Sequence, residues 1–184
     1  MDEIRHLALL QDDAVNVLVQ DLWGNVQGSN SEEKLADVRR FNNDVRAARG
    51  NPAEGRVIFN KHCGKCHRLF GEGKDIGPDL TYANRKDTQY LLVNIVDPSS
   101  IVRKEYASYI VRTHNGRVLT GLLVELTPTT VTIQDENERT TVSRGEVALI
   151  KESSLSPMPE RILNDLSPGQ RRDLFSYLQR DAPP

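Results

Sequence analysis

Long apolar segments are absent from this sequence, and so is any excess of basic charge. No stretch approaches the roughly 18 consecutive apolar residues that a membrane-spanning helix needs. Charged residues make up 27% of the chain and the formal net charge is −2, so the basic surface expected of a nucleic-acid-binding protein is missing. The composition is typical of a globular protein, and 184 residues are enough for one domain or two small ones, with a hydrophobic core.

Signals for export and for catalysis are missing as well. The first residues, MDEIRHLALLQDD, have acidic side chains where a signal peptide needs a basic one, and their apolar run is short. No nucleophile paired with a general base and no oxyanion-binding arrangement is visible. The sequence therefore predicts no enzyme active site of its own.

Cysteine is scarce, and both cysteines of the chain lie in one short stretch, FNKHCGKCHRLF. Cys63, Cys66 and His67 form the pattern Cys-x-x-Cys-His, through which c-type haem is attached. Two thiols three residues apart at a helix end can form thioethers with the two vinyl groups of haem, and the adjacent imidazole can then bind the iron. The motif predicts one covalently bound haem c.

Three alternatives to this interpretation remain. A structural zinc site normally needs four nitrogen or sulfur ligands, and only His62, His67 and the distant His114 could complete one. A thioredoxin-like dithiol normally follows a strand in an α/β pattern, whereas a helix is expected before Cys63. Two buried structural thiols would leave the adjacent histidine without a role.

Hydrophobic periodicity separates a helical part of the chain from a β part. Apolar spacing and cap residues predict five helices, over about 2–26, 31–49, 52–62, 88–96 and 168–181. Between Tyr106 and Ile150 the period changes to two, which predicts four or five short antiparallel strands. Asn115-Gly116 is the strongest hairpin signal. The predicted fold is mainly helical, interrupted by a small curled β module, and is therefore α+β overall.

Together these motifs resemble a class I c-type cytochrome, and more closely the haem-binding cytochrome c domain of large planctomycete and verrucomicrobial proteins. The similarity extends over residues 51–182 and rests on AEGRVIFNKHCGKCHRLFGEGKDIGPDLT, LLVNIVDPSSIV, EYASYIVRTHNGRVLTGLLVE and SSLSPMPERILNDLSPGQRRDLFSYL. The resemblance implies a cytochrome c domain formed by residues 51–106 and 152–184. The β module at 107–151 would be inserted into it, and a helical pair at 1–50 would precede it.

A sixth iron ligand decides whether such a haem transfers electrons or binds small molecules. Besides Met1, the only methionine is Met158 in SLSPMPERI, where prolines on both sides limit backbone freedom. The resemblance also implies a Met-Pro here, although Pro157 departs from the family's usual Ser-Leu-Met-Pro. We therefore expect His67 and Met158 as axial ligands. The alternatives are His62 or His114 as the ligand, and Met158 as a core residue.

Further residues take their expected roles from the resemblance. IGPDL resembles the Gly-Pro-x-Leu turn, in which the carbonyl of Pro78 accepts a hydrogen bond from Nδ1–H of His67. The helix crossing typical of the family would involve Gly55, Phe59, Leu174 and Tyr177. The expected haem wall comprises Leu69, Ile76, Leu80, Leu91, Leu92, Ile95, Ile101 and Leu155. The candidates for binding the propionates are Tyr82, Arg85 and Tyr106.

The predicted function is one-electron transfer by a single haem with His/Met ligation. A haem-based gas sensor or peroxidase with a labile sixth ligand is the alternative, and a zinc-stabilised binding module is a third. Because haem c is attached after export, we expect a periplasmic or otherwise extracytoplasmic location. We also expect the chain to be the C-terminal piece of a longer exported protein. Its partner would be a redox protein or an upstream dehydrogenase-like domain, with the β module as a docking surface or a shield.

Overall fold

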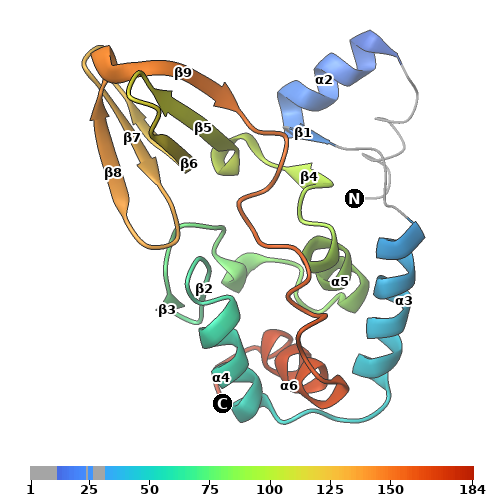
Figure 1. Ribbon diagram of the computed structural model, residues 1–184. Coiled ribbons are helices and arrows are strands. Elements are labelled where there is room, and N and C mark those ends of the chain that lie inside the picture. The colour runs from blue at the N-terminus through green and yellow to red at the C-terminus, as the bar shows by residue number, and fades with distance from the viewer. Residues whose placement is uncertain (1–11, 24, 27–31) are drawn as a thin grey trace. The chain divides into compact units, whose positions relative to one another are not determined.

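The computed structural model describes residues 12–23, 25–26 and 32–184, so Met1 and the expected start of the second helix at residue 31 lie outside the described residues. The helices are α2 Asp13–Trp23, α3 Glu32–Arg46, α4 Pro52–His62, α5 Thr88–Val96 and α6 Pro168–Leu178 (Figure 1). The chain divides into two compact units. Unit 1 comprises the described residues of Met1–Gly28 together with Ser99–Met158, and unit 2 those of Ser29–Pro98 together with Pro159–Pro184.

The helices of unit 2 begin where their cap residues predict. The Asn51 side chain accepts a hydrogen bond from the Ala53 N–H at 3.0 Å before α4, and Asp87 accepts from Tyr90 N–H at 3.0 Å before α5. Ser167 and Gln170 form a reciprocal capping box at the start of α6. These side chains satisfy N–H groups that have no partner inside the helix. The three predicted helix starts are confirmed.

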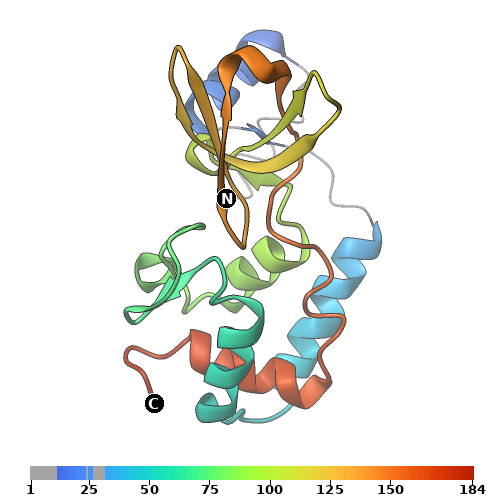
Figure 2. The same ribbon diagram turned by 60° about the vertical axis from the view of Figure 1, so that its left-hand side comes forward.

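Helices α4 and α6 cross at close range (Figure 2). A Cβ on Gly55 would collide with the carbonyl oxygen of Asp173 and would lie 2.7 Å from Cβ of Tyr177. The rings of Phe59 and Tyr177 pack with centroids 5.4 Å apart, and Leu174 is buried in the same core cluster. The predicted crossing is confirmed, because a glycine lets the two backbones approach.

The Tyr177 hydroxyl offers a test of this core. It is buried and has no hydrogen-bond partner among the described residues. The change Tyr177→Phe removes the unsatisfied group and keeps the ring packing, so the free energy of unfolding should stay the same or rise by up to about 1 kcal/mol. Denaturant titration of the haem-loaded protein measures this. A loss of more than about 1 kcal/mol would indicate that the hydroxyl has a stabilising partner.

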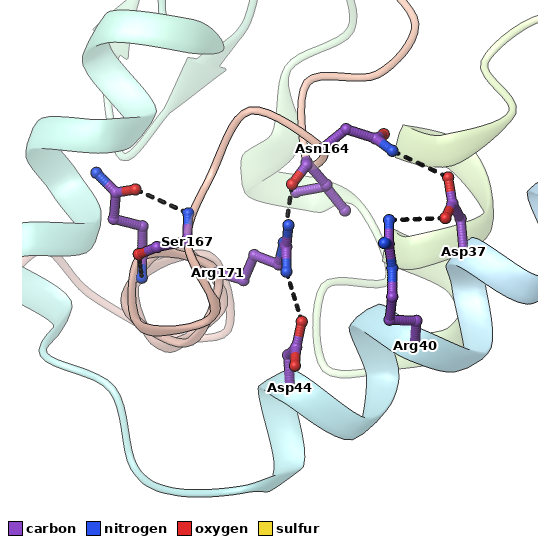
Figure 3. A network of polar contacts seen from close by, with 8 residues as sticks. Asp37, Arg40, Asp44, Asn164, Ser167 and Arg171 are labelled. Carbon is purple, nitrogen blue, oxygen red and sulfur yellow. Dashed lines mark hydrogen bonds and ion pairs between the residues drawn. The ribbon is translucent and has the colours of Figure 1, made fainter.

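Helix α3 belongs to the core of unit 2. Phe41 of α3 is fully buried. The Arg171 guanidinium lies 4.4 Å from the centre of its ring and 2.5 Å from Oδ2 of Asp44, and the Arg171 Nε donates to the Leu163 carbonyl at 2.8 Å. Figure 3 shows the polar contacts of Arg171 and its neighbours between α3, α6 and the segment before α6. The apolar face of α3 covers the other helices, so the unit begins before residue 50.

Unit 1 contains a curled antiparallel sheet of five strands in the order β8-β7-β6-β5-β9 (Figures 1 and 2). The strands are β5 Ser108–Thr113, β6 Val118–Leu126, β7 Thr130–Gln134, β8 Arg139–Ser143 and β9 Val147–Glu152. The register shifts in the β5–β9 and β6–β7 ladders, and such irregularities increase strand twist. Val111, Val131, Ile133 and Val142 form its buried core. The prediction of four or five short antiparallel strands is confirmed, and the sheet has five.

A second, smaller pairing also lies in unit 1. β1 Asn25–Val26 pairs antiparallel with β4 Ile101–Val102, which follows α5. This two-stranded ladder ties the described end of the N-terminal segment to the start of the β region, so α2 falls in unit 1 and α3 in unit 2. From the sequence we expect Trp23 to pack the N-terminal helical pair onto the cytochrome domain, but its side chain lies outside what the structure describes. No described helix is long and apolar enough to cross a bilayer.

Candidate functional site

The end of α4 brings Cys63, Cys66 and His67 together in one tight turn. Cys63 is the C-cap of α4, and its N–H donates to the carbonyl of Phe59 at 2.7 Å. The N–H groups of Cys66 and His67 both donate to the carbonyl of Cys63, at 3.0 and 2.9 Å. Both cysteines, which lie in the described part of the chain, are half-buried and form no disulfide. The two thiols and the imidazole are thus carried by one hydrogen-bonded turn at the end of α4.

The following loop folds back over this turn. The N–H groups of Ile76 and Gly77 donate to the Cys66 carbonyl at 3.0 and 2.7 Å, and Lys74 N–H donates to the Gly64 carbonyl at 3.1 Å. These bonds leave little freedom to the backbone of the attachment motif. The motif is therefore held in shape by a segment about ten residues further along the chain.

The predicted bond between His67 and Pro78 is present, with Nδ1 of His67 2.9 Å from the Pro78 carbonyl oxygen. Because a carbonyl oxygen only accepts, Nδ1 carries the proton and the lone pair is on Nε2. Burial lowers the pKa of His67, and the bond to Pro78 partly opposes this effect. The imidazole is thus held neutral and in the tautomer that can bind a metal through Nε2.

The thiol environment argues against the dithiol alternative. Burial, and to a lesser extent the neighbouring Cys66, raise the pKa of Cys63 to about 12. Redox-active dithiols instead have a cysteine with a lowered pKa, since the thiolate is the nucleophile. Helix α4 also precedes Cys63, where a thioredoxin-like motif would have a strand.

The zinc alternative lacks a ligand set. Among the residues that the structure describes, no group of three or more His, Cys, Asp or Glu side chains is placed to hold a metal ion. His62 is half-buried at the end of α4, with its pKa lowered by burial first and by Lys61 second. His114 is exposed on the turn between β5 and β6.

A short hairpin directly after His67 was not predicted from the sequence. β2 Arg68–Leu69 pairs with β3 Glu72–Gly73, and the two turn residues Phe70 and Gly71 have φ angles of 54° and 83°. Positive φ at both positions matches a tight primed turn. The turn places the Phe70 ring edge-on against Tyr177 of α6, with centroids 5.8 Å apart. The only local sign of this hairpin in the sequence is Gly71 directly after Phe70, and a single glycine is a weak signal for a turn.

The sequence also gave no role to Gly77 beyond its place in the Gly-Pro turn. A Cβ at this position would lie 2.7 Å from Cε1 and 3.0 Å from Nδ1 of His67. Any larger residue would therefore press on the imidazole ring at Cε1 and Nδ1. Gly77 is required because the chain passes directly against the ring.

Among the predicted propionate and wall residues of unit 2, Arg85 has a structural role. Its buried guanidinium donates to the carbonyl of Leu178, the last residue of α6, and to that of Arg180 just beyond it. It therefore satisfies a carbonyl that has no partner inside the helix, and the helix ends three residues before the predicted residue 181. Leu80 is half-buried and packs against the core cluster. Tyr82 is 90% exposed. Propionate binding by Tyr82, Arg85 and Tyr106 stays a prediction.

Four of the predicted residues lie in unit 1: Ile101, Tyr106, Leu155 and Met158. Met158 is half-buried, and its N–H donates to Oγ of Ser156 at 3.1 Å. Ser156 N–H in turn donates to Oγ of Ser99 at 3.1 Å, so side chains brace the segment just before the methionine. Tyr106 ends a short 3₁₀ turn and is half-buried. Leu155, expected in the haem wall, is 59% exposed.

The residues at the end of α4 fit a covalently attached haem. Two thiols lie at the helix end and form no disulfide. The imidazole of His67 has Nε2 available for the iron. Gly77 has no side chain, so the ring has room beside it. Cys63 and Cys66 would form the thioethers and His67 would bind the iron. This donor set is that of haem c.

Comparison with known proteins agrees with this site. The family model for cytochrome c matches residues 52–128, from the start of α4 to just beyond β6. No curated protein matches the chain. The matched segment contains Cys63, Cys66, His67 and Pro78. Residues 52–128 thus match a c-type cytochrome domain, a haem-binding module for electron transfer whose cofactor is covalently bound haem c.

Proposed function

We propose that this domain carries single electrons through one haem c with His67 and Met158 as axial ligands. The observation that carries the proposal is the bond from Nδ1 of His67 to the Pro78 carbonyl. It fixes the ring plane and the tautomer, and it increases the basicity of Nε2. When bound, haem c supplies an iron that alternates between the ferric and ferrous states. The thioethers keep the group in place through repeated oxidation and reduction.

Three features support Met158 as the sixth ligand. Apart from Met1 it is the only methionine of the chain, and prolines on both sides restrict its backbone. Its N–H and that of Ser156 are bound by serine hydroxyls, which reduces the loss of conformational entropy on ligation. A buried gap-filling methionine would instead be almost fully enclosed, whereas Met158 is half-buried.

Exchange of the methionine tests the proposal. Met158→Ala should leave haem covalently attached, because the thioethers are independent of the sixth ligand. It should lower the reduction potential, since a thioether favours ferrous iron, and open the reduced iron to carbon monoxide. Mass spectrometry, potentiometry and absorption spectra with and without carbon monoxide measure these effects. A reduced wild-type protein that binds carbon monoxide freely would favour the gas-sensor or peroxidase function instead.

The wider context of the domain is also part of the proposal. Haem c attachment follows export, and domains of this family are typically extracytoplasmic, so we place this domain in the periplasm or a similar compartment. We further propose that it receives electrons from a redox partner or from an upstream dehydrogenase-like domain of a larger exported protein, related to the planctomycete and verrucomicrobial proteins. Fractionation of cells that make the haem-loaded protein tests the location.

A further inference from the structure

One face of α3 follows the chain segment that leads from Met158 to α6. Nζ of Lys34 lies 2.9 Å from Oε1 of Glu160, and Oδ2 of Asp37 accepts from Nδ2 of Asn164 at 3.1 Å. Further along the same face, Asp44 binds Arg171 (Figure 3). Spacings of three and seven residues place Lys34, Asp37 and Asp44 on one side of the helix. Helix α3 precedes the residues that the cytochrome c family model matches.

Lys34 has a second carboxylate partner in the same unit. Its Nζ lies 2.6 Å from Oδ1 of Asp97, the C-cap of α5. Asp97 is only 4% exposed, so the lysine compensates a carboxylate that the fold has taken out of water. Burial alone would lower the pKa of Lys34, but the hydrogen bonds to Asp97 and Glu160 raise it above its usual value. The ammonium group therefore stays charged at neutral pH.

The two carboxylates lie at matching places in the chain. Unit 2 ends at Pro98, directly after Asp97, and resumes at Pro159, directly before Glu160. Lys34 thus binds one carboxylate next to the point where the chain leaves unit 2 and another next to the point where it returns. Glu160 is also only two residues beyond Met158.

The backbone after Glu160 is strained. Arg161 has a φ of 67°, which a non-glycine residue adopts only at a cost. Such a conformation persists where the neighbours on both sides are fixed. On one side Lys34 binds Glu160, and on the other side Leu163 is 1% exposed and its carbonyl accepts from Arg171. The contacts of α3 and α6 therefore determine the path of this segment.

We infer that Lys34 is a positioning residue for the axial methionine, acting through Glu160 on the chain that carries Met158. This inference rests on the proposed His67/Met158 ligation. By holding the chain two residues after the methionine, the lysine reduces the number of backbone arrangements open to the thioether. A ligand held in this way competes better with external ligands for the iron, because less entropy is lost when it binds.

Imidazole binding to the ferric, haem-loaded protein tests the inference. Glu160→Gln removes the ion pair between Lys34 and Glu160 and leaves only a weaker hydrogen bond to a neutral amide oxygen, while Asp97 keeps its lysine. This variant should therefore fold, and its affinity for imidazole should rise about five- to tenfold. Lys34→Met should cause at least the same increase. The double variant should bind imidazole no more tightly than Lys34→Met alone, because the two residues act through one bond. Lys34→Arg, which keeps the charge, should restore most of the wild-type value.

Asp165→Asn is the matched control. Asp165 is exposed, lies five residues beyond Glu160, and has no hydrogen bond or ion pair among the described residues. The change neutralises one carboxylate in the same segment, so it reproduces the general electrostatic effect without the bond. Imidazole affinity should remain at the wild-type value. Equal increases in Glu160→Gln and Asp165→Asn would overturn the positioning role, since charge alone would then explain both.

The outcomes separate the inference from the function on which it rests. If wild-type iron is closed and Met158→Ala opens it, but Glu160→Gln and Lys34→Met bind imidazole like the wild type, the positioning role is wrong and the ligation stands. If the wild type already binds imidazole as tightly as Met158→Ala does, the methionine is not a ligand and the proposed function fails. If the affinity for imidazole rises in Lys34→Met but not in Glu160→Gln, the effect arises from the bond to Asp97, and action through Glu160 is contradicted.

Discussion

Replacing Gly55 by alanine should destabilise the protein strongly, although alanine is the better helix former. The added Cβ would collide with the Asp173 carbonyl and would lie 2.7 Å from Cβ of Tyr177. Neither atom is the end of a flexible side chain, so α4 and α6 must move apart. Overpacking of this kind costs about 1–3 kcal/mol, and occasionally more. Because backbone is involved, we expect the upper end of that range in the free energy of unfolding.

Gly169→Ala is the matched control, since Gly169 is the second residue of α6. A Cβ there would meet its nearest atoms, in Arg172 and Ser167, only at 3.7 and 3.8 Å. The same substitution should therefore raise the free energy of unfolding by about 0.5–1 kcal/mol, through the reduced backbone freedom of the unfolded chain. Denaturant titration followed by helical circular dichroism compares the two. Stabilisation by Gly55→Ala would contradict a close helix crossing.

Local signals explain which parts of the fold could be predicted from the sequence. Asn51, Asp87 and Ser167 each bond N–H groups within the next three residues, so the start of each helix depends on its neighbours in sequence. The five strands could also be predicted locally, because alternating apolar and polar residues and the turn residues between them define each strand over a short stretch. The attachment motif could be predicted because it is a contiguous pattern, whereas the role of its partner Pro78 was implied by the resemblance to cytochromes c.

The features that were missed depend on contacts between distant residues. The apolar face of α3 could be identified, but its partners Leu163 and Arg171 lie more than a hundred residues further on. The hairpin after His67 requires a positive φ at Phe70, an aromatic residue that rarely adopts it. Its packing against Tyr177, and a bond from Arg56 Nε to Glu72 at 2.9 Å, hold that turn. None of these partners can be inferred from the local sequence.

The second prediction with a large expected effect concerns Gly77→Ala at the haem site. A methyl group there would lie 2.7 Å from Cε1 and 3.0 Å from Nδ1 of His67. The ring must tilt or shift to avoid it, and its bond to the Pro78 carbonyl must lengthen. Haem should still attach, because Cys63 and Cys66 do not contact the new group. The bond from Nε2 of His67 to the iron should become weaker.

The expected size follows from the role of the Pro78 bond. Loss of such a supporting hydrogen bond typically costs about 10- to 100-fold in metal affinity. The ferric ion depends more on a basic imidazole than the ferrous ion does. A loss that fell on the ferric state alone would raise the reduction potential by about 60–120 mV. Potentiometry measures this shift, and the absorption spectrum shows how much of the haem has lost the low-spin state produced by two strong ligands.

Pro78→Ala separates the effect of the ring contact from a general effect of changing this turn. Alanine keeps the carbonyl that accepts from His67, so the potential of this variant should stay close to that of the wild type. If both variants shift the potential equally, the conformation of the turn matters rather than the space beside the imidazole. If Gly77→Ala leaves the spectrum and the potential unchanged, the ring is not held against this backbone in the haem-loaded protein. His67 would then owe its orientation to the iron, and the Pro78 bond would follow from ligation instead of preparing it.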